Sequence, residues 1–243
     1  MAAIAQWPVY RSVEPMKWVR IPLAALRVIE MKIKSIILDN DGTLYKLRPG
    51  FKEKIVQSMV SYLSDKLGIT EKEAATLRTA LIGKYGVEST EFVFGKEYDI
   101  SYDDFVNSTY LSVDVRKNGI NYNKKLRDML KGIKLPKSIL TNNTSEFARK
   151  ILESLGIEDL FENVIGSREL DYKLKPSSEA FLKAIEVTGY DPKKTMFVDD
   201  IPQFHLVAKN LGMATVLIGE AKYPYVDYNI KSIFGIKNVL GVE

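Results

Sequence analysis

Residues 31–44 of the sequence read MKIKSIILDNDGTL, and this stretch decides the fold. Its first half ends in an apolar run at 36–38, which is typical of a strand inside a parallel sheet. Its second half is polar and opens with Asp39 and Asp41, which are separated by one residue. Parallel sheets carry their functional loops at the carboxyl ends of their strands. The stretch therefore predicts a core strand with a functional loop directly after it.

Strand-like runs and helical patterns alternate along the rest of the chain. Beside the first strand at 33–38, the sequence predicts strands at 137–141, 163–166, 195–198 and 214–218. Helical periodicity, with glycine after each run, predicts helices at 144–156, 177–189 and 203–212. Strands that alternate with helices of this length form βαβ units. The predicted fold is therefore α/β, a Rossmann-like parallel sheet covered on both faces.

A helical segment interrupts this alternation after the first strand. Residues 51–67, 71–85 and 101–111 have helical patterns, and a helix at 122–132 leads into the second strand. We predict a small helical cap domain at 47–117, inserted into a core domain made of 31–46 and 118–243. Met31 resembles a natural start, so residues 1–30 are predicted to be a dispensable extension.

Composition narrows the function classes. The 243 residues include no cysteine and one histidine, His205, which argues against zinc-thiolate sites, thiol nucleophiles and a histidine-based triad. The 35 basic and 31 acidic residues are interspersed, so nucleic-acid binding is not expected. No apolar run is long enough to span a bilayer, and we expect a cytoplasmic protein without a membrane partner.

Polar residues that suit phosphoryl transfer follow several predicted strands. Asp199 and Asp200 follow the run at 196–198. Together with Asp39 and Asp41 they would repel one another strongly unless a cation lay between them. In a chain with so little histidine and no cysteine, oxygen ligands indicate magnesium, calcium or manganese.

Anion-binding groups accompany these carboxylates. The run 141–143, Thr-Asn-Asn, precedes a predicted helix, whose first N–H groups favour an anion. Lys175 stands just before Pro176 at the start of another helix. A transferring phosphoryl group needs its oxygens neutralised from several sides, and these residues could do so.

In order along the chain, these motifs resemble the four motifs of the haloacid dehalogenase-like (HAD) hydrolase superfamily. They are the run 39–44 (DNDGTL), Thr141-Asn142, Lys175-Pro176 and Asp199-Asp200. The resemblance covers the chain from about Met31 to its end. The placement of the insert is similar to the helical-cap class, and the segments 41–45, 84–86 and 226–230 resemble pyrimidine 5′-nucleotidase-like members. The chain differs from these members at Ile201, Phe204 and Glu91, so the resemblance implies the reaction more closely than the substrate.

The resemblance implies a role for each matching residue. It makes Asp39 the nucleophile and Asp41 the acid that protonates the leaving oxygen and then activates water. It assigns a Mg²⁺ site to Asp39, the Asp41 backbone carbonyl, Asp199 and, directly or through water, Asp200. Thr141 and the Asn142 backbone would hold phosphoryl oxygens, and Lys175 would balance their charge.

The leading hypothesis is a magnesium-dependent phosphomonoester hydrolase for a small soluble phosphate, such as a nucleotide or sugar phosphate. A phosphomutase of the same fold and a vestigial binding or regulatory protein are the alternatives. Either Lys173 or Lys175 could point into the site, and for His205 a packing or surface position is favoured over a catalytic role. The sequence assigns no role to the aromatic residues Tyr45, Tyr85, Phe92 and Phe94, and it leaves the oligomeric state open.

Overall fold

The computed structural model describes residues 33–241, and their strands form a single parallel sheet. The six strands lie in the order β3-β2-β1-β4-β5-β6, and each neighbouring pair is parallel. Their bounds are β1 Ser35–Leu38, β2 Lys137–Leu140, β3 Asn163–Ile165, β4 Thr195–Asp199, β5 Ala214–Ile218 and β6 Tyr228–Ile230. The predicted Rossmann-like α/β class is confirmed.

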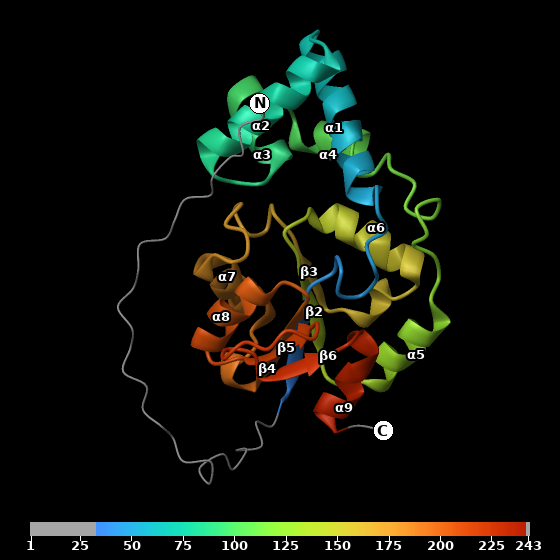
Figure 1. Cartoon of the computed structure of the whole chain (residues 1–243), viewed down its shortest axis with the longest axis vertical. Coiled ribbons are helices and arrows are strands. Elements are labelled where there is room, and N and C mark those ends of the chain that lie inside the picture. The colour runs from blue at the N-terminus through green and yellow to red at the C-terminus, as the bar shows by residue number, and fades with distance from the viewer. Residues whose placement is uncertain (1–32, 242–243) are drawn as a thin grey trace. The chain divides into compact units, whose positions relative to one another are not determined.

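Helices cover both faces of the sheet. Successive β1 side chains point to opposite faces, and apolar side chains of this strand are buried on each of them. Ile36 and Leu38 belong to one core cluster and Ile37 to a second. Helices α5 (Lys124–Gly132), α6 (Ser145–Leu155) and α9 (Ile236–Leu240) pack into the first cluster. Helices α7 (Ser178–Thr188) and α8 (Pro202–Asn210) pack into the second. Figure 1 shows the two groups on opposite sides of the sheet.

The chain reverses its direction across the sheet at β1. From β1 it proceeds to β2 and β3 on one side, and then returns to β4, β5 and β6 on the other. Ligands of open α/β sheets bind beyond the carboxyl ends of the strands at such a switch point. The loops that follow β1 and β4 are therefore the place to look for a site.

Four helices lie between β1 and α5, as the helical insert requires. They are α1 (Phe51–Leu67), α2 (Glu71–Tyr85), α3 (Thr90–Tyr98) and α4 (Tyr102–Ser108). The first two have the predicted bounds, α4 is shorter than predicted, and α3 was not predicted. These helices share a core cluster with α5 and α6. The boundaries of the cap at 47 and 117 stay a prediction, and residues 1–30 lie outside the described residues.

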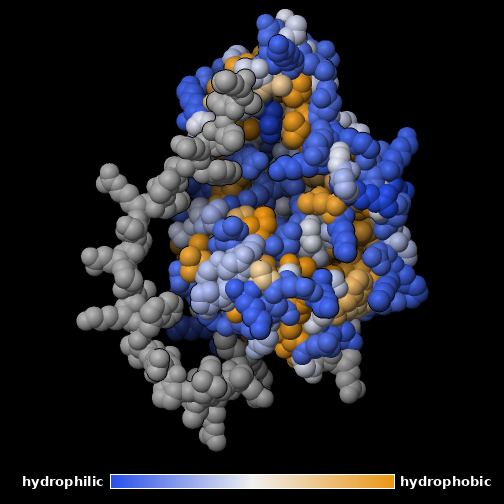
Figure 2. Space-filling model, in the orientation of Figure 1, coloured by the Kyte–Doolittle hydropathy of each residue, from blue (hydrophilic) through white to orange (hydrophobic). Residues whose placement is uncertain are grey.

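The surface of the described residues is predominantly polar. Figure 2 shows hydrophilic residues over most of the visible face. Among the described helices, none combines the length and apolar character needed to cross a membrane.

Candidate active site

Three carboxylates meet where β1 and β4 end. These strands pair with Leu38 beside Val198, so the residues that follow, Asp39 and Asp199, emerge side by side. Asp39, Asp199 and Asp200 each offer one carboxylate oxygen, and the three oxygens lie within 4.8 Å of one another. The structure therefore brings together the two segments that the sequence analysis expected to converge, 39–41 and 199–200.

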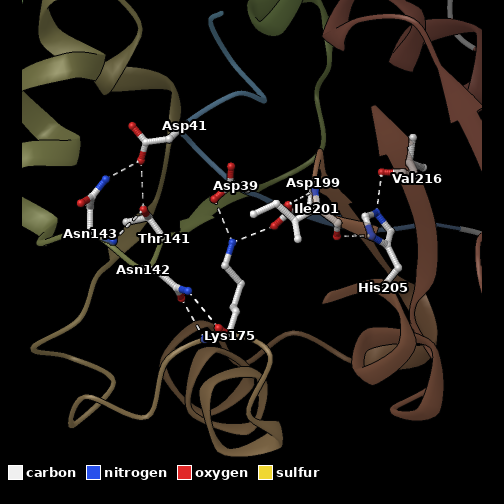
Figure 3. A network of polar contacts seen from close by, with 10 residues as sticks. All are labelled: Asp39, Asp41, Thr141, Asn142, Asn143, Lys175, Asp199, Ile201, His205 and Val216. Atoms are coloured by element: carbon white, nitrogen blue, oxygen red, sulfur yellow. Dashed lines mark hydrogen bonds and ion pairs between the residues drawn. The ribbon is translucent and has the colours of Figure 1, made fainter. Parts of the chain in front are cut away.

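Lys175 lies between two of these carboxylates. Its Nζ donates to Asp39 Oδ1 at 2.8 Å and to Asp199 Oδ2 at 2.7 Å (Figure 3). The Lys175 side chain is only 1% exposed, whereas Lys173 is exposed. Of the two lysines that the sequence left open, Lys175 is thus the one that enters the site. Burial opposes its charge, but Asp199 and Asp39 more than compensate and raise the pKa of Lys175 above its ordinary value.

Asn142 fixes the backbone from which Lys175 extends. The Asn142 side chain donates through Nδ2 to the Lys175 carbonyl at 2.9 Å and accepts the Lys175 N–H at 2.8 Å (Figure 3). This two-point contact joins the loop after β2 to the segment that precedes α7. The Asn142 side chain therefore orients the lysine, a role that the sequence analysis did not assign to it.

The carboxylates repel one another in the absence of a cation. Burial, with Asp199 and Asp41 nearby, raises the pKa of Asp39 to about 7 although Lys175 opposes the shift. Burial and the neighbouring Asp39 also raise the pKa of Asp200 to about 6. Burial likewise raises the pKa of Asp199. The protein thus holds more negative charge at this point than Lys175 balances.

The residues present fit a hard divalent cation such as Mg²⁺. All three side chains offer oxygen, which is the donor that Mg²⁺ prefers. Asp200 Oδ1 is buried and has no hydrogen-bond partner within the described part of the chain. A buried polar atom without a partner destabilises the fold unless a ligand or ion binds to it. Asp39, Asp199 and Asp200 could therefore hold the ion.

Gly42 allows the Asp200 carboxylate to come close to the first loop. Its φ is +88°, and a Cβ built on it would lie 2.3 Å from Asp200 Oδ2. An L side chain at position 42 would be strained by its backbone and would also collide with the carboxylate. The glycine is required both for the turn and for the approach of Asp200.

Asp41 lies apart from the three-carboxylate group and has its own donors. Its Oδ2 accepts from Asn143 Nδ2 at 2.8 Å and from Thr141 Oγ1 at 3.4 Å (Figure 3). Its Oδ1 accepts from the hydroxyl of Tyr45. Burial and the nearby Asp41 raise the pKa of Tyr45 above its ordinary value, so the phenol remains a donor.

The contacts of Tyr45 and Asn143 with Asp41 were not predicted from the sequence. Both residues stand in strand-end loops that the sequence had identified, Tyr45 four residues after Asp41 and Asn143 directly after Asn142. Their positions were the available signal, but sequence does not tell which way a loop side chain points. Thr141, expected to hold a phosphoryl oxygen, contacts Asp41 and lies 1% exposed.

His205 is a packing residue, as the sequence analysis favoured. It is fully buried, with Nδ1 3.0 Å from the Ile201 carbonyl and Nε2 3.0 Å from the Val216 carbonyl (Figure 3). Burial lowers its pKa although both carbonyls oppose the shift. The ring joins α8 to β5.

A buried carboxylate of the helical insert contacts the core beside these loops. Glu91, on α3, is 3% exposed and accepts from Ser167 Oγ at 2.9 Å. The Ser167 N–H donates to the Asn143 carbonyl at 2.8 Å. Among the aromatic residues left without a role, Phe94 is fully buried, and the Phe92 ring lies 4.4 Å from that of Tyr172.

Comparison with known proteins agrees with this geometry. The family profile of haloacid dehalogenase-like hydrolases matches residues 33–206. The chain is 24% identical to the pyrophosphatase PpaX of Halalkalibacterium halodurans, over 88% of this chain and 99% of that protein. It is 32% identical to a phosphoglycolate phosphatase of Aquifex aeolicus, over 41% of this chain and 44% of that protein.

A solved structure has the same fold. A HAD phosphatase of Thermococcus onnurineus superimposes with a TM-score of 0.61 at 24% identity, over 87% of this chain and 99% of that one.

Proposed function

The chain belongs to the haloacid dehalogenase-like hydrolases, and from this premise we propose that it is a phosphatase that hydrolyses small phosphate monoesters through a phosphorylated Asp39. The observation that carries the proposal is the separation of the two aspartates of the first loop. Asp39 lies with Lys175 and the other carboxylates, whereas Asp41 is held beside them by Tyr45 and Asn143. Asp39 can attack phosphorus while Asp41 donates and accepts the proton.

In the first step, an Asp39 carboxylate oxygen forms a bond to phosphorus as the bond to the ester oxygen breaks. The ester oxygen takes that electron pair together with the proton of Asp41 and leaves as an alcohol. Lys175 stays charged beside Asp39 and balances negative charge that gathers on the phosphoryl oxygens.

In the second step, Asp41 takes a proton from water as the water oxygen bonds to phosphorus. The bond between phosphorus and Asp39 breaks, and inorganic phosphate leaves with Asp39 restored as a carboxylate. The balance is one ester and one water consumed, one alcohol and one phosphate formed. When bound by Asp39, Asp199 and Asp200, Mg²⁺ supplies positive charge next to the phosphoryl oxygens.

Two further observations support a phosphatase rather than a dehalogenase. Asp41 is a carboxyl group that could protonate a leaving oxygen, and a halide leaving group does not require such an acid. The relatives named above are a pyrophosphatase and a phosphoglycolate phosphatase, and both act on phosphate compounds by their names. We propose that nucleoside monophosphates and sugar phosphates belong among the substrates to be screened first.

The test is phosphate release from a panel of nucleotides, sugar phosphates and p-nitrophenyl phosphate. We expect activity with MgCl₂, loss of activity in excess chelator and recovery when Mg²⁺ is added. Asp39→Asn should reduce turnover to the detection limit, because an amide is a far poorer nucleophile than a carboxylate. Asp128→Asn, which changes an exposed aspartate on α5, is the matched control. Activity that persists in Asp39→Asn, or transfer of phosphate to a second hydroxyl without release, contradicts the proposal.

A further inference from the structure

The carboxylate of Asp41 is bracketed by two side chains from different loops. Tyr45 donates to Oδ1 from the loop after β1, and Asn143 donates to Oδ2 at 2.8 Å from the loop after β2. We infer that Tyr45 and Asn143 are positioning residues that aim the Asp41 carboxylate at the leaving-group oxygen. This inference rests on the proposed function and goes beyond the roles that the motifs carry.

The Tyr45 side chain, whose hydroxyl donates to Asp41, is held in place by its surroundings. The ring is partly buried and packs against the core cluster that contains Ile36 and Leu38. A backbone bridge also pairs Tyr45 with Asp41, which closes the loop between them. Because both ring and backbone are held, the hydroxyl approaches Asp41 from one direction. A hydrogen bond from a group with little freedom restricts its acceptor strongly.

Asn143 is held at both ends of its backbone. Its N–H donates to Thr141 Oγ1 at 3.1 Å, and its carbonyl accepts from the Ser167 N–H at 2.8 Å. The amide Nδ2 can only donate, and it contacts one lone pair of Asp41 Oδ2. Thr141 Oγ1 approaches the same oxygen at 3.4 Å, so the acceptor position that stays available is the second lone pair of Oδ1. The two donors therefore fix the plane of the carboxylate without using all of its acceptor capacity.

In the first step, the orientation of Asp41 matters only when the leaving group needs a proton. The ratio kcat/KM reports this step alone, because departure of the leaving group is irreversible and the water step, in which Asp41 acts as base, comes after it. An alkyl alcohol is a poor leaving group unless it is protonated as the bond to phosphorus breaks, whereas p-nitrophenolate leaves readily without a proton. A general acid contributes roughly 10²–10⁴-fold to steps that need it. If the Asp41 carboxylate is wrongly oriented, kcat/KM should therefore fall for alkyl phosphates and change little for p-nitrophenyl phosphate.

The experiment compares kcat/KM for two substrates at saturating MgCl₂. The alkyl substrate is the nucleotide or sugar phosphate that the panel shows to be hydrolysed fastest, and the aryl substrate is p-nitrophenyl phosphate. Tyr45→Phe keeps the ring and removes the hydroxyl, and we expect about a tenfold or larger loss on the alkyl substrate. On the aryl substrate the loss should stay below about threefold. Asn143→Ala should give the same pattern, and it decides the question if Tyr45→Phe fails to fold.

The matched control is Tyr62→Phe. Tyr62 donates to Asp104 Oδ2 at 2.7 Å within the helical insert, so this variant also removes one tyrosine–aspartate hydrogen bond. This variant should change kcat/KM for both substrates by the same factor or leave both values unchanged. In an Asp41→Asn background, Tyr45→Phe should cause no further loss on the alkyl substrate, because residues that act through one group are not additive.

The outcomes separate this inference from the proposed function. A wild-type protein without activity on any phosphate of the panel overturns both. With an active wild type, equal losses on the two substrates, or full additivity with Asp41→Asn, overturn the positioning role of Tyr45 and leave the phosphatase standing. A loss confined to the alkyl substrate supports both.

Discussion

Lys175 is the residue on which the charge balance of the site depends. It is buried, and it is ion-paired with both Asp39 and Asp199. Removal of one member of a buried ion pair leaves an uncompensated charge and costs about 3–5 kcal/mol. We expect Lys175→Met to lose activity and to lower the free energy of unfolding by that amount, measured by urea denaturation in chelator.

Lys173→Met is the control for this prediction. Lys173 lies two residues away and is exposed, so its replacement should change the unfolding free energy by less than about 0.5 kcal/mol. If Lys173→Met caused the larger loss of activity, the assignment of Lys175 would be wrong.

Asp39 gives the metal-free protein a characteristic dependence on pH. The raised pKa of about 7 means that folded Asp39 keeps its proton over a range where the unfolded chain has lost it. The folded state then binds more protons, so the unfolding free energy falls as pH rises from about 4 to 7. Burial lowers the pKa of His205, which acts in the opposite direction near pH 6.5.

The Asp39 contribution is isolated by comparing wild type with Asp39→Asn. Between pH 5 and pH 7 in chelator, wild type should lose stability relative to the variant. MgCl₂ should abolish this relative loss, because a cation beside Asp39 favours its ionised form. Parallel curves for the two proteins in thermal or urea unfolding contradict the prediction.

At the scale of elements, helix α2 is defined by its ends. Thr70 accepts from the Glu73 N–H at 3.3 Å, and the Glu73 carboxylate accepts from the Thr70 N–H at 2.8 Å. The loss of such an N-cap costs about 1 kcal/mol. We expect Thr70→Ala to lower the unfolding free energy by this amount and to leave kcat on p-nitrophenyl phosphate unchanged at 25 °C. Thr76→Ala, inside the same helix, should be neutral or slightly stabilising, because alanine is the better helix former.

Local patterns explain which elements the sequence predicted well. Helices α1 and α2 were predicted with their observed bounds from their helical patterns, and Gly68, Thr70 and Gly86 lie at their ends in the structure. Helix α3 was missed because it is short, contains Gly95 and lacks a clear apolar period. Strand β6 was missed because it has three residues, two of them exposed. Neither element has a local pattern that distinguishes it from a loop.

At the scale of the whole molecule, the described residues contain a complete sheet with both of its covering layers. All six strands and both core clusters lie within 33–241. We therefore expect a chain that begins at Met31 to fold and to keep the activity of the full chain. Thermal unfolding and phosphate release, measured side by side on the two chains, test this. A lower melting temperature or lower kcat in the shorter chain would show that residues 1–30 contribute to the fold.

The sequence predicted the order of the elements and the set of charged residues better than their contacts. Asp39, Lys175 and Asp199 converge as expected because the apolar strands before them or beside them dictate where the loops emerge. The side-chain directions of Asn142 and Tyr45 could not be predicted, because they depend on loop geometry that no period or cap encodes. Substrate choice depends on such contacts too.

The central position of β1 has a consequence for how the protein is made. This strand emerges first from the ribosome among the described elements, yet its neighbours in the sheet start only at Lys137 and Thr195. Pairing over such separations is slow, because a long loop must close before any contact stabilises it. The apolar strand before Asp39 therefore has no sheet partner while residues 39–136 are synthesised, and it is exposed to incorrect pairing during that time.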